Sequence, residues 1–167
     1  MTHDAESRWV VPDYAWLFRS EFTGVVRTVY LIVHDRGRAE EIAQEAFLIL
    51  FQNWAKVSRY DKPGAWVRRI AIRMAVRQSR REKIRPALEQ RATASADDGL
   101  PDMTVLDTIG TLPAMQRAVL VLHYWDDRPV ADIAGLLEVS ESTVKQHLLR
   151  ARRKMAVLLG EETPDAS

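Results

Sequence analysis

The sequence predicts an all-α protein built from two small helical domains that are joined by an extended linker. Apolar residues recur at helical spacing through nearly the whole chain, and no stretch alternates with a period of two for long enough to indicate a sheet. Residues 85–101 (RPALEQRATASADDGLP) contain almost nothing large and apolar, which is typical of a linker. These two observations predict a flexible N-terminus at 1–12, a first domain at 13–85, a linker at 86–104, a second domain at 105–158 and a flexible tail at 159–167.

Charge is also divided along the chain, although the net charge is only +1. Residues 61–91 carry ten Lys and Arg against three Asp and Glu, residues 92–127 carry six Asp against one Arg, and residues 128–155 carry six basic against three acidic residues. Basic segments of this density favour binding to polyanions, while a solvated helix face remains the alternative.

The composition excludes several classes of protein. The chain has no cysteine, so disulfides, thiolate metal sites and cysteine nucleophiles are excluded. The four histidines are scattered without the spacing of metal ligands, and there is no glycine-rich phosphate loop. We therefore expect no catalytic residues, no metal, no cofactor and no enzymatic activity. No export signal or apolar stretch of membrane length is present, so we expect a cytoplasmic protein without membrane insertion.

In the first domain, the apolar spacing predicts helices at residues 13–33, 38–54 and 63–83, with Gly37 breaking the first from the second. Pro63 suits a first helical turn. In the third helix, one side is expected to pack through Trp66, Ile70 and Met74, while another side carries Arg69, Arg73, Arg77 and Arg80.

The second domain is predicted to contain helices near 103–110, 113–124, 129–137 and 141–158. Residues 130–150 (VADIAGLLEVSESTVKQHLLR) have the pattern of a helix-turn-helix, with Ile133, Ala134 and Leu137 facing Val144 and Leu148. Ser140 is placed as the N-cap of the last helix. Glu138 stands where such turns often use glycine, which costs about 1 kcal/mol if the residue adopts positive φ.

Two pairs of segments resemble the sigma-70 family of RNA polymerase sigma factors. Residues 39–47 (AEEIAQEAF) and 65–71 (AWVRRIA) are similar to its region 2, and residues 112–124 (LPAMQRAVLVLHY) with the helix-turn-helix are similar to its region 4. The short linker resembles that of the extracytoplasmic-function (ECF) group. The resemblance implies a transcription initiation factor that binds core RNA polymerase and directs it to promoter DNA.

The resemblance also assigns residues to partners. It implies that the second helix contacts the β′ clamp helices of core polymerase, and that helix 113–124 contacts the β flap. It further implies that the loop at 53–61 and the third helix capture melted −10 DNA, and that the last helix reads duplex −35 DNA. An anti-sigma factor is implied as a partner, and the acidic linker with Asp97, Asp98 and Asp102 resembles a segment threaded through the polymerase cleft.

The expected site residues follow from these matches. For core polymerase they are Glu41, Gln44, Glu45 and Leu48. For −10 DNA they are Lys56, Arg59, Tyr60, Arg68, Arg69, Arg73, Arg77 and Arg80. For −35 DNA they are Ser140, Ser142, Thr143, Lys145, Gln146, Arg150 and Arg153.

Two alternatives and one departure from the family pattern stay open at this point. Trp54 can belong to the core of the first domain rather than stack on a base, and Arg73 departs from the asparagine that the family often has there. The whole chain can also be a stand-alone helix-turn-helix regulator, which binds duplex DNA without polymerase.

Overall fold

The computed structural model describes residues 3–81 and 102–160, with side chains for residues 14–81, 102 and 104–160. Every regular element in these ranges is a helix and none is a strand, which confirms the all-α prediction. The helices are α1 (His3–Val33), α2 (Arg36–Gln52), α3 (Trp54–Val57), α4 (Pro63–Arg81), α5 (Met103–Thr111), α6 (Ala114–Tyr124), α7 (Val130–Leu137) and α8 (Glu141–Leu158).

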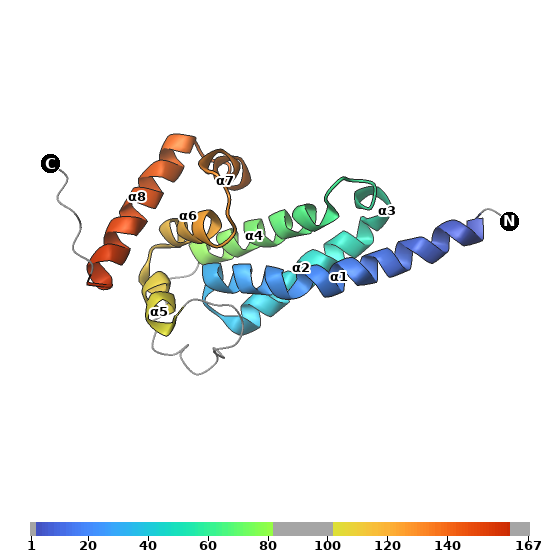
Figure 1. The fold of residues 1–167 in the computed structure, drawn as a ribbon, viewed down its shortest axis with the longest axis horizontal. Helices are drawn as coiled ribbons and strands as arrows, with labels where there is room; N and C mark the ends of the chain where they lie inside the picture. The colour runs from blue at the N-terminus through green and yellow to red at the C-terminus, as the bar shows by residue number, and fades with distance from the viewer. Residues whose placement is uncertain (1–2, 82–101, 161–167) are drawn as a thin grey trace.

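The first helical group consists of α1, α2 and α4, which pack on one another, with the short α3 at one end (Figure 1). Its core contains Val25 and Val29 from α1, Phe47 from α2 and Ile72 from α4, and each of these is almost fully buried. The helices hold together because each places an apolar stripe against the other two.

The start of α1 differs from the sequence prediction, whereas its end agrees. The helix begins at His3 and not at residue 13, so it continues through Pro12. It ends at Val33, and the break lies at His34, whose φ of 57° is in the left-handed region, and not at Gly37, which lies inside α2. Asp35 then caps α2 by accepting a hydrogen bond from the backbone N–H of Arg38 at 3.1 Å.

The expected packing stripe of α4 is also shifted. Trp66, Ile70 and Met74 are only half-buried, while the fully buried positions include Val67 and Ala71. Small residues line the closest contacts because α4 is packed against both α1 and α2. Helical spacing alone predicted that the larger side chains Trp66, Ile70 and Met74 are buried, but they lie at the edge of this contact.

The second helical group agrees closely with the prediction. Helices α5 to α8 match the expected ranges to within one or two residues. Ser140 caps α8, its hydroxyl accepting from the backbone N–H of Thr143 at 3.1 Å. Ile133, Ala134, Val144 and Leu148 are buried, as the helix-turn-helix pattern predicts, whereas Leu137 is only half-buried and its neighbour Leu136 is buried instead.

The two groups lie against each other, with α6 packed on α1 and α4, and α7 packed on α4 (Figure 1). Arg117 of α6 is buried at this contact and donates a hydrogen bond from Nε to the carbonyl oxygen of Ile32, at 2.6 Å. Residues 86–101 of the expected linker lie outside the described residues, including Asp97 and Asp98. Asp102, which was assigned to the linker, is the N-cap of α5 and accepts from the backbone N–H of Thr104 at 3.0 Å.

Candidate nucleic-acid interface

Two aromatic residues in the segment between α2 and α4 differ in how far they are exposed to solvent. Trp54 is buried, with its ring 5.4 Å from that of Tyr14 in an edge-on arrangement. Tyr60, six residues later, is 42% exposed. Asn53 fixes the start of the loop, since its side chain donates to the carbonyl oxygen of Ile49 at 2.8 Å. Trp54 therefore belongs to the core, and Tyr60 is the aromatic ring that the loop presents to solvent.

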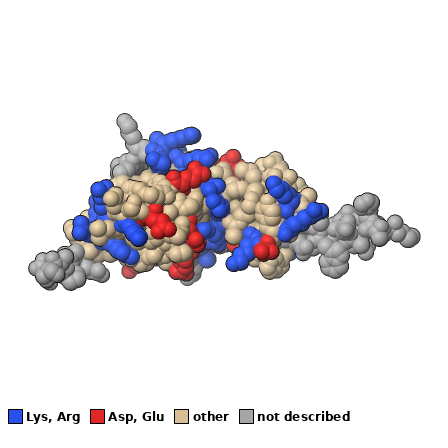
Figure 2. All heavy atoms as spheres, turned by 90° about the horizontal axis from the view of Figure 1, so that it is seen from above, with Lys and Arg blue, Asp and Glu red and all other residues tan. Residues whose placement is uncertain are grey.

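Most of the cations expected at −10 DNA surround this loop or follow α4, and they are exposed. Those with exposed side chains are Lys56, Arg59, Arg69, Arg77 and Arg80. On the face drawn in Figure 2, basic side chains form separate groups with acidic side chains between them. Exposed guanidinium and ammonium groups beside an aromatic ring suit the phosphates and bases of a single strand.

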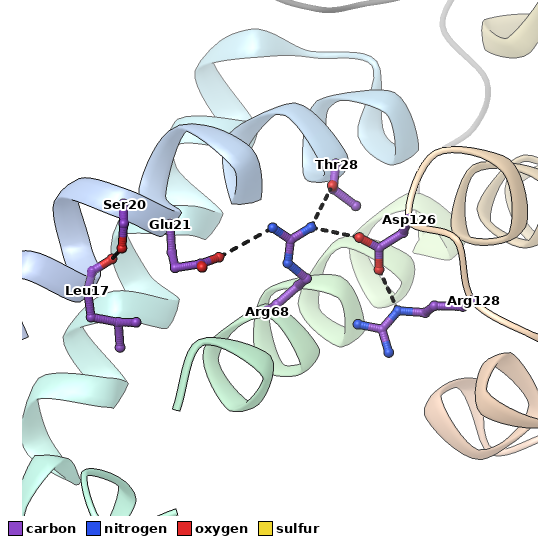
Figure 3. Close-up of polar contacts among 7 residues, drawn as sticks. All are labelled: Leu17, Ser20, Glu21, Thr28, Arg68, Asp126 and Arg128. Carbon is purple, nitrogen blue, oxygen red and sulfur yellow. Dashed lines mark hydrogen bonds and ion pairs between the residues drawn. The ribbon is translucent and has the colours of Figure 1, made fainter. Parts of the chain in front are cut away.

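Arg68 differs from these residues because its guanidinium is already engaged (Figure 3). Its Nη1 lies 2.6 Å from Oδ1 of Asp126, in the segment between α6 and α7, and its Nη2 lies 3.4 Å from Oε2 of Glu21 in α1. Nη1 also donates to the hydroxyl of Thr28 at 3.5 Å. The other oxygen of Asp126 accepts from Arg128, so two arginines share one carboxylate.

Arg73 is engaged in a similar way, one and a half turns further along α4. Its Nε donates to the carbonyl oxygen of Leu136 at 3.1 Å, at the end of α7. Its Nη2 lies 3.8 Å from Oε1 of Glu138, which is mostly exposed. The sequence predicted neither of these contacts, because no local pattern links Arg73 to residues more than 60 positions away.

The start of α8 presents a cluster of hydroxyl groups. The Oγ of Ser140 lies 3.0 Å from that of Ser142 and 2.8 Å from Oγ1 of Thr143. Glu138 occupies the preceding turn with φ of 57° and ψ of 45°, as the sequence analysis anticipated. Of the residues expected at −35 DNA, Thr143 is half-buried and the others are exposed: Ser140, Ser142, Lys145, Gln146, Arg150 and Arg153. Polar groups of this kind at a helix start suit hydrogen bonding in a major groove.

The middle of α8 lies close to the end of α4. Burial lowers the pKa of His147, and the charges of Arg150 and of Arg80 from α4 lower it further. Nδ1 of His147 is buried with no hydrogen-bond partner among the described residues. The two basic segments that the sequence separates by the linker are therefore neighbours in space.

The residues expected to contact polymerase share one face of α2. Glu41, Gln44, Glu45 and Leu48 are all exposed, and Leu48 is 55% exposed. Phe51, one turn after Leu48, is 59% exposed and extends the apolar end of this face. Phe51 was not among the residues expected from the sequence, although its spacing from Leu48 places it on the same side of the helix.

A second apolar surface lies between α5, α6 and α8, where sequence reasoning named only the helix at 113–124. It is an open groove of about 380 Å³, lined by Ile109, Leu120, Tyr124, Trp125, Arg152, Met155, Ala156 and Leu159. Arg152 crosses its rim, since its Nε donates to the hydroxyl of Tyr124 at 2.5 Å. A groove with aromatic and aliphatic walls is suited to an apolar segment of a partner.

The part of the chain that the structure describes contains neither a candidate metal site nor a helix that could span a membrane. In the described ranges, no three His, Asp or Glu residues gather in a way that could hold a metal ion. No helix in the same ranges has the length and apolar character needed to cross a bilayer.

Comparisons with known proteins match both helical groups. Residues 17–84 match the family described as Sigma-70 region 2, and residues 102–155 match Sigma-70, region 4. The chain is 26% identical over 161 residues to the RNA polymerase sigma-E factor of Streptomyces avermitilis, covering 93% of this chain and 90% of that protein. It is 32% identical over 155 residues to the ECF RNA polymerase sigma factor SigM of Mycobacterium tuberculosis, covering 86% of this chain and 76% of that protein.

A solved structure has the same fold. The sigma factor RpoE of Bartonella quintana, determined in complex with the anti-sigma factor NepR, superimposes with a TM-score of 0.67 at 20% identity. The match covers 90% of this chain and 99% of that chain.

Proposed function

The chain belongs to the sigma-70 family of RNA polymerase sigma factors, in its extracytoplasmic-function group, and on this premise we propose how its helices divide the work of initiation. It is a transcription initiation factor that binds core RNA polymerase and directs it to promoter DNA. The observation that carries this conclusion is the presence of both region 2 and region 4, in that order, in one chain.

The face of α2 with Glu41, Gln44, Glu45 and Leu48 contacts the β′ clamp helices. This assignment is supported by the exposed carboxylates beside an exposed leucine on this face, and Phe51 extends its apolar part. Such a face can bind a basic partner through charge and hold it through apolar burial. The groove between α5, α6 and α8 receives an apolar segment of the β flap.

The loop after α2 and the following helix capture the melted −10 strand. Tyr60 offers a ring on which a base can stack, and Lys56, Arg59, Arg69, Arg77 and Arg80 follow the phosphates. Arg68 and Arg73 also contact the phosphates, once their own contacts with the second helical group are broken. Strand capture is the step at which binding energy is converted into promoter opening.

Helix α8 reads the −35 duplex in the major groove. Ser140, Ser142 and Thr143 lie at its start, Lys145 and Gln146 follow, and Arg150 and Arg153 are placed for phosphates further along. We assign capture of the −10 strand to the expected domain at residues 13–85 and recognition of the −35 duplex to the expected domain at residues 105–158.

The chain itself catalyses no reaction, because polymerase supplies the bond-forming chemistry. It works in the cytoplasm, where polymerase and promoter DNA are found. We also propose that an anti-sigma factor binds it and covers the polymerase-binding faces; the complex of the Bartonella quintana relative supports such a partner.

The stand-alone regulator is not favoured. A helix-turn-helix alone accounts for residues 130–150, but it leaves the match of residues 17–84 to region 2 without an explanation.

Transcription in vitro tests the function. Core polymerase with the purified chain is offered a random promoter library, and we expect run-off transcripts from a distinct set of promoters that share −10 and −35 sequences. A verified polymerase complex that stimulates no promoter overturns the proposal. Specific binding to duplex DNA without polymerase would favour the stand-alone regulator.

The α2 face is tested separately, by affinity for core polymerase. Leu48→Asp places a charge in the apolar part of the face, and we expect affinity to fall at least tenfold. Thr23→Asp introduces the same charge at an exposed position of α1 and should leave affinity unchanged. Equal affinities for the two variants would remove Leu48 from the interface.

A further inference from the structure

One arginine stands in the apolar groove between α5, α6 and α8. Helix α8 packs on both α5 and α6 (Figure 1), and the buried side chains of Ile109 and Leu120 form part of the groove wall. Tyr124 and Trp125, at the end of α6, are 48% and 40% exposed. Among the described residues that line the groove, Arg152 alone is charged. A partner in this groove therefore meets an apolar surface with a single positive charge.

The guanidinium of Arg152 is held in place by Tyr124. Its Nε donates to the hydroxyl of Tyr124 at 2.5 Å, and its Cζ lies 5.4 Å from the centre of the same ring. In the part of the chain that the structure describes, no carboxylate pairs with Arg152, so its two Nη groups are open to a partner. Paired N–H donors of this kind match the two oxygens of a carboxylate.

The contact with Tyr124 also prepares Arg152 for binding. An exposed arginine normally loses rotamer freedom when it forms an ion pair, and this loss weakens the pair. The guanidinium of Arg152 already has a fixed position, so less freedom is lost. Arg153 and Lys154, the next residues of α8, are exposed and do not line the groove. Arg152 is therefore the cation of this segment that is best placed to recognise a partner in the groove.

The surroundings of Arg152 favour a protein partner over DNA. Ser140 caps the start of α8, and Arg152 lies about three turns, or roughly 18 Å, further along the helix. A DNA backbone carries a phosphate at every nucleotide and gains little from aromatic and aliphatic walls. A protein segment with apolar side chains and one carboxylate complements both the walls of the groove and its single charge.

We propose that Arg152 selects the segment that binds in this groove: it pairs with a carboxylate on an apolar helical segment of the β flap, and Tyr124 is the positioning residue that holds its guanidinium. Apolar side chains three and four residues apart on that segment fill the groove, and the carboxylate lies within one turn of them. A segment without the carboxylate leaves Arg152 unpaired and binds more weakly. The inference rests on the proposed role of the groove in binding the β flap.

The affinity of the full chain for core polymerase tests the role of Arg152. Arg152→Glu reverses the charge in the groove, and we expect affinity to fall about tenfold, because close charge pairs at interfaces are strongly coupled. Lys154→Glu is the matched control, since it makes the same charge change at an exposed position of α8 outside the groove. It should change affinity by about twofold or less. Equal affinities of the two variants would overturn the proposal.

A charge swap identifies the carboxylate on the flap. Each Asp and Glu of the flap segment is changed to Lys, one at a time, in reconstituted core polymerase. We expect one of these changes to weaken binding of the unsubstituted chain about tenfold and to return Arg152→Glu to within about twofold of the original affinity. Restored binding also shows that Arg152→Glu folds. If no flap substitution restores binding by Arg152→Glu, the ion pair does not exist.

Tyr124→Phe tests the positioning of the guanidinium. It removes the hydroxyl that accepts from Arg152 but keeps the ring in the groove wall. We expect affinity for core polymerase to fall about threefold when Arg152 is present, and not to fall further in the Arg152→Glu background, because the two residues act through one contact. Equal losses in the two backgrounds would contradict a positioning role for Tyr124.

Core polymerase that lacks the flap segment separates this inference from the proposed function. The unsubstituted chain should bind it more weakly than intact polymerase, and Arg152→Glu should bind it as the unsubstituted chain does. If removing the flap leaves the affinity of the unsubstituted chain unchanged, the groove does not bind the flap and its proposed function fails. If removal weakens binding, but Arg152→Glu loses as much affinity for the shortened polymerase as for the intact one, the inference alone fails.

Discussion

The Nε atom of Arg117 donates to the backbone carbonyl oxygen of Ile32 at 2.6 Å, and this bond ties α6 to the last turn of α1. The Nη1 atom of Arg117 donates to two more carbonyl oxygens, of Gly110 and Leu112. Burial lowers the pKa of this guanidinium. A buried cation is tolerated here because carbonyl groups at helix ends satisfy its donors.

Arg117→Ala should therefore destabilise the chain. It leaves a cavity and buried carbonyl groups without their donor, and we expect the free energy of unfolding in urea to fall by about 3 kcal/mol. Arg117→Met keeps the volume and should lose less. Arg27→Ala, at an exposed position of α1, is the control and should change stability by about 0.5 kcal/mol or less. Equal effects of Arg117→Ala and Arg27→Ala would contradict a structural role for the buried arginine.

His34 predicts a dependence of stability on pH. Burial, with a contribution from the charge of Arg117, lowers the pKa of His34 from 6.5 to about 4. The unfolded chain therefore takes up this proton at a higher pH than the folded chain. The stabilisation is present above pH 6.5 and is lost as pH falls towards 4, by about 2 kcal/mol between pH 7 and pH 5.

His34→Asn isolates this contribution in urea unfolding at pH 7 and at pH 5. Asparagine tolerates the left-handed φ of 57° but does not titrate, so the variant should lose less stability between the two pH values. His147, whose pKa is also lowered, acts in the same direction and is common to both chains. An identical pH dependence in the two chains would show that His34 does not carry the effect.

Replacing Glu138 by glycine should stabilise the chain, because Glu138 has a left-handed backbone conformation. Its φ of 57° and ψ of 45° are costly for a side chain with a Cβ and natural for glycine. Glu138→Gly should raise the free energy of unfolding by about 0.5 to 1 kcal/mol, measured in urea. Glu138→Ala removes the same carboxylate without relieving the backbone, so it should give no gain. If both variants behave alike, the backbone conformation is not the source of the cost.

Tyr60 predicts a loss of single-strand binding. Removing the ring in Tyr60→Ala should weaken binding of a −10 non-template oligonucleotide about tenfold, since stacking on one base is worth about 1 to 3 kcal/mol. Fluorescence anisotropy with a promoter strand from the selected library measures it. Tyr60→Phe keeps the ring and should bind as the original chain does. Unchanged binding by Tyr60→Ala would exclude stacking at this position.

The helix-turn-helix could be predicted almost completely from the sequence. The N-cap at Ser140, the buried Val144 and Leu148 and the strained turn at Glu138 all depend on residues within one or two turns of each other. Local hydrogen bonding and helical periodicity determine such features. For Trp54 the sequence left two alternatives open, and the structure decides for the core.

The engagement of Arg68, Arg73 and Arg117 could not be predicted in this way. In the sequence, Arg68 and Arg73 are two members of a regular basic series, and Arg117 is the single cation of an acidic stretch. Their partners Asp126, Leu136 and Ile32 lie 58, 63 and 85 positions away. No local pattern carries information about contacts at that separation.

The sequence by itself determined the all-α class, the two helical groups, the cap and turn of the helix-turn-helix and the resemblance that the family matches confirmed. These features follow from side-chain spacing and backbone chemistry within each segment. Only the tertiary structure decided which cations of α4 are free and which are held, because that depends on how α6 and α7 pack against α1 and α4. Packing brings a buried carboxylate to Arg68, and a partner at this distance competes with any phosphate for the same guanidinium.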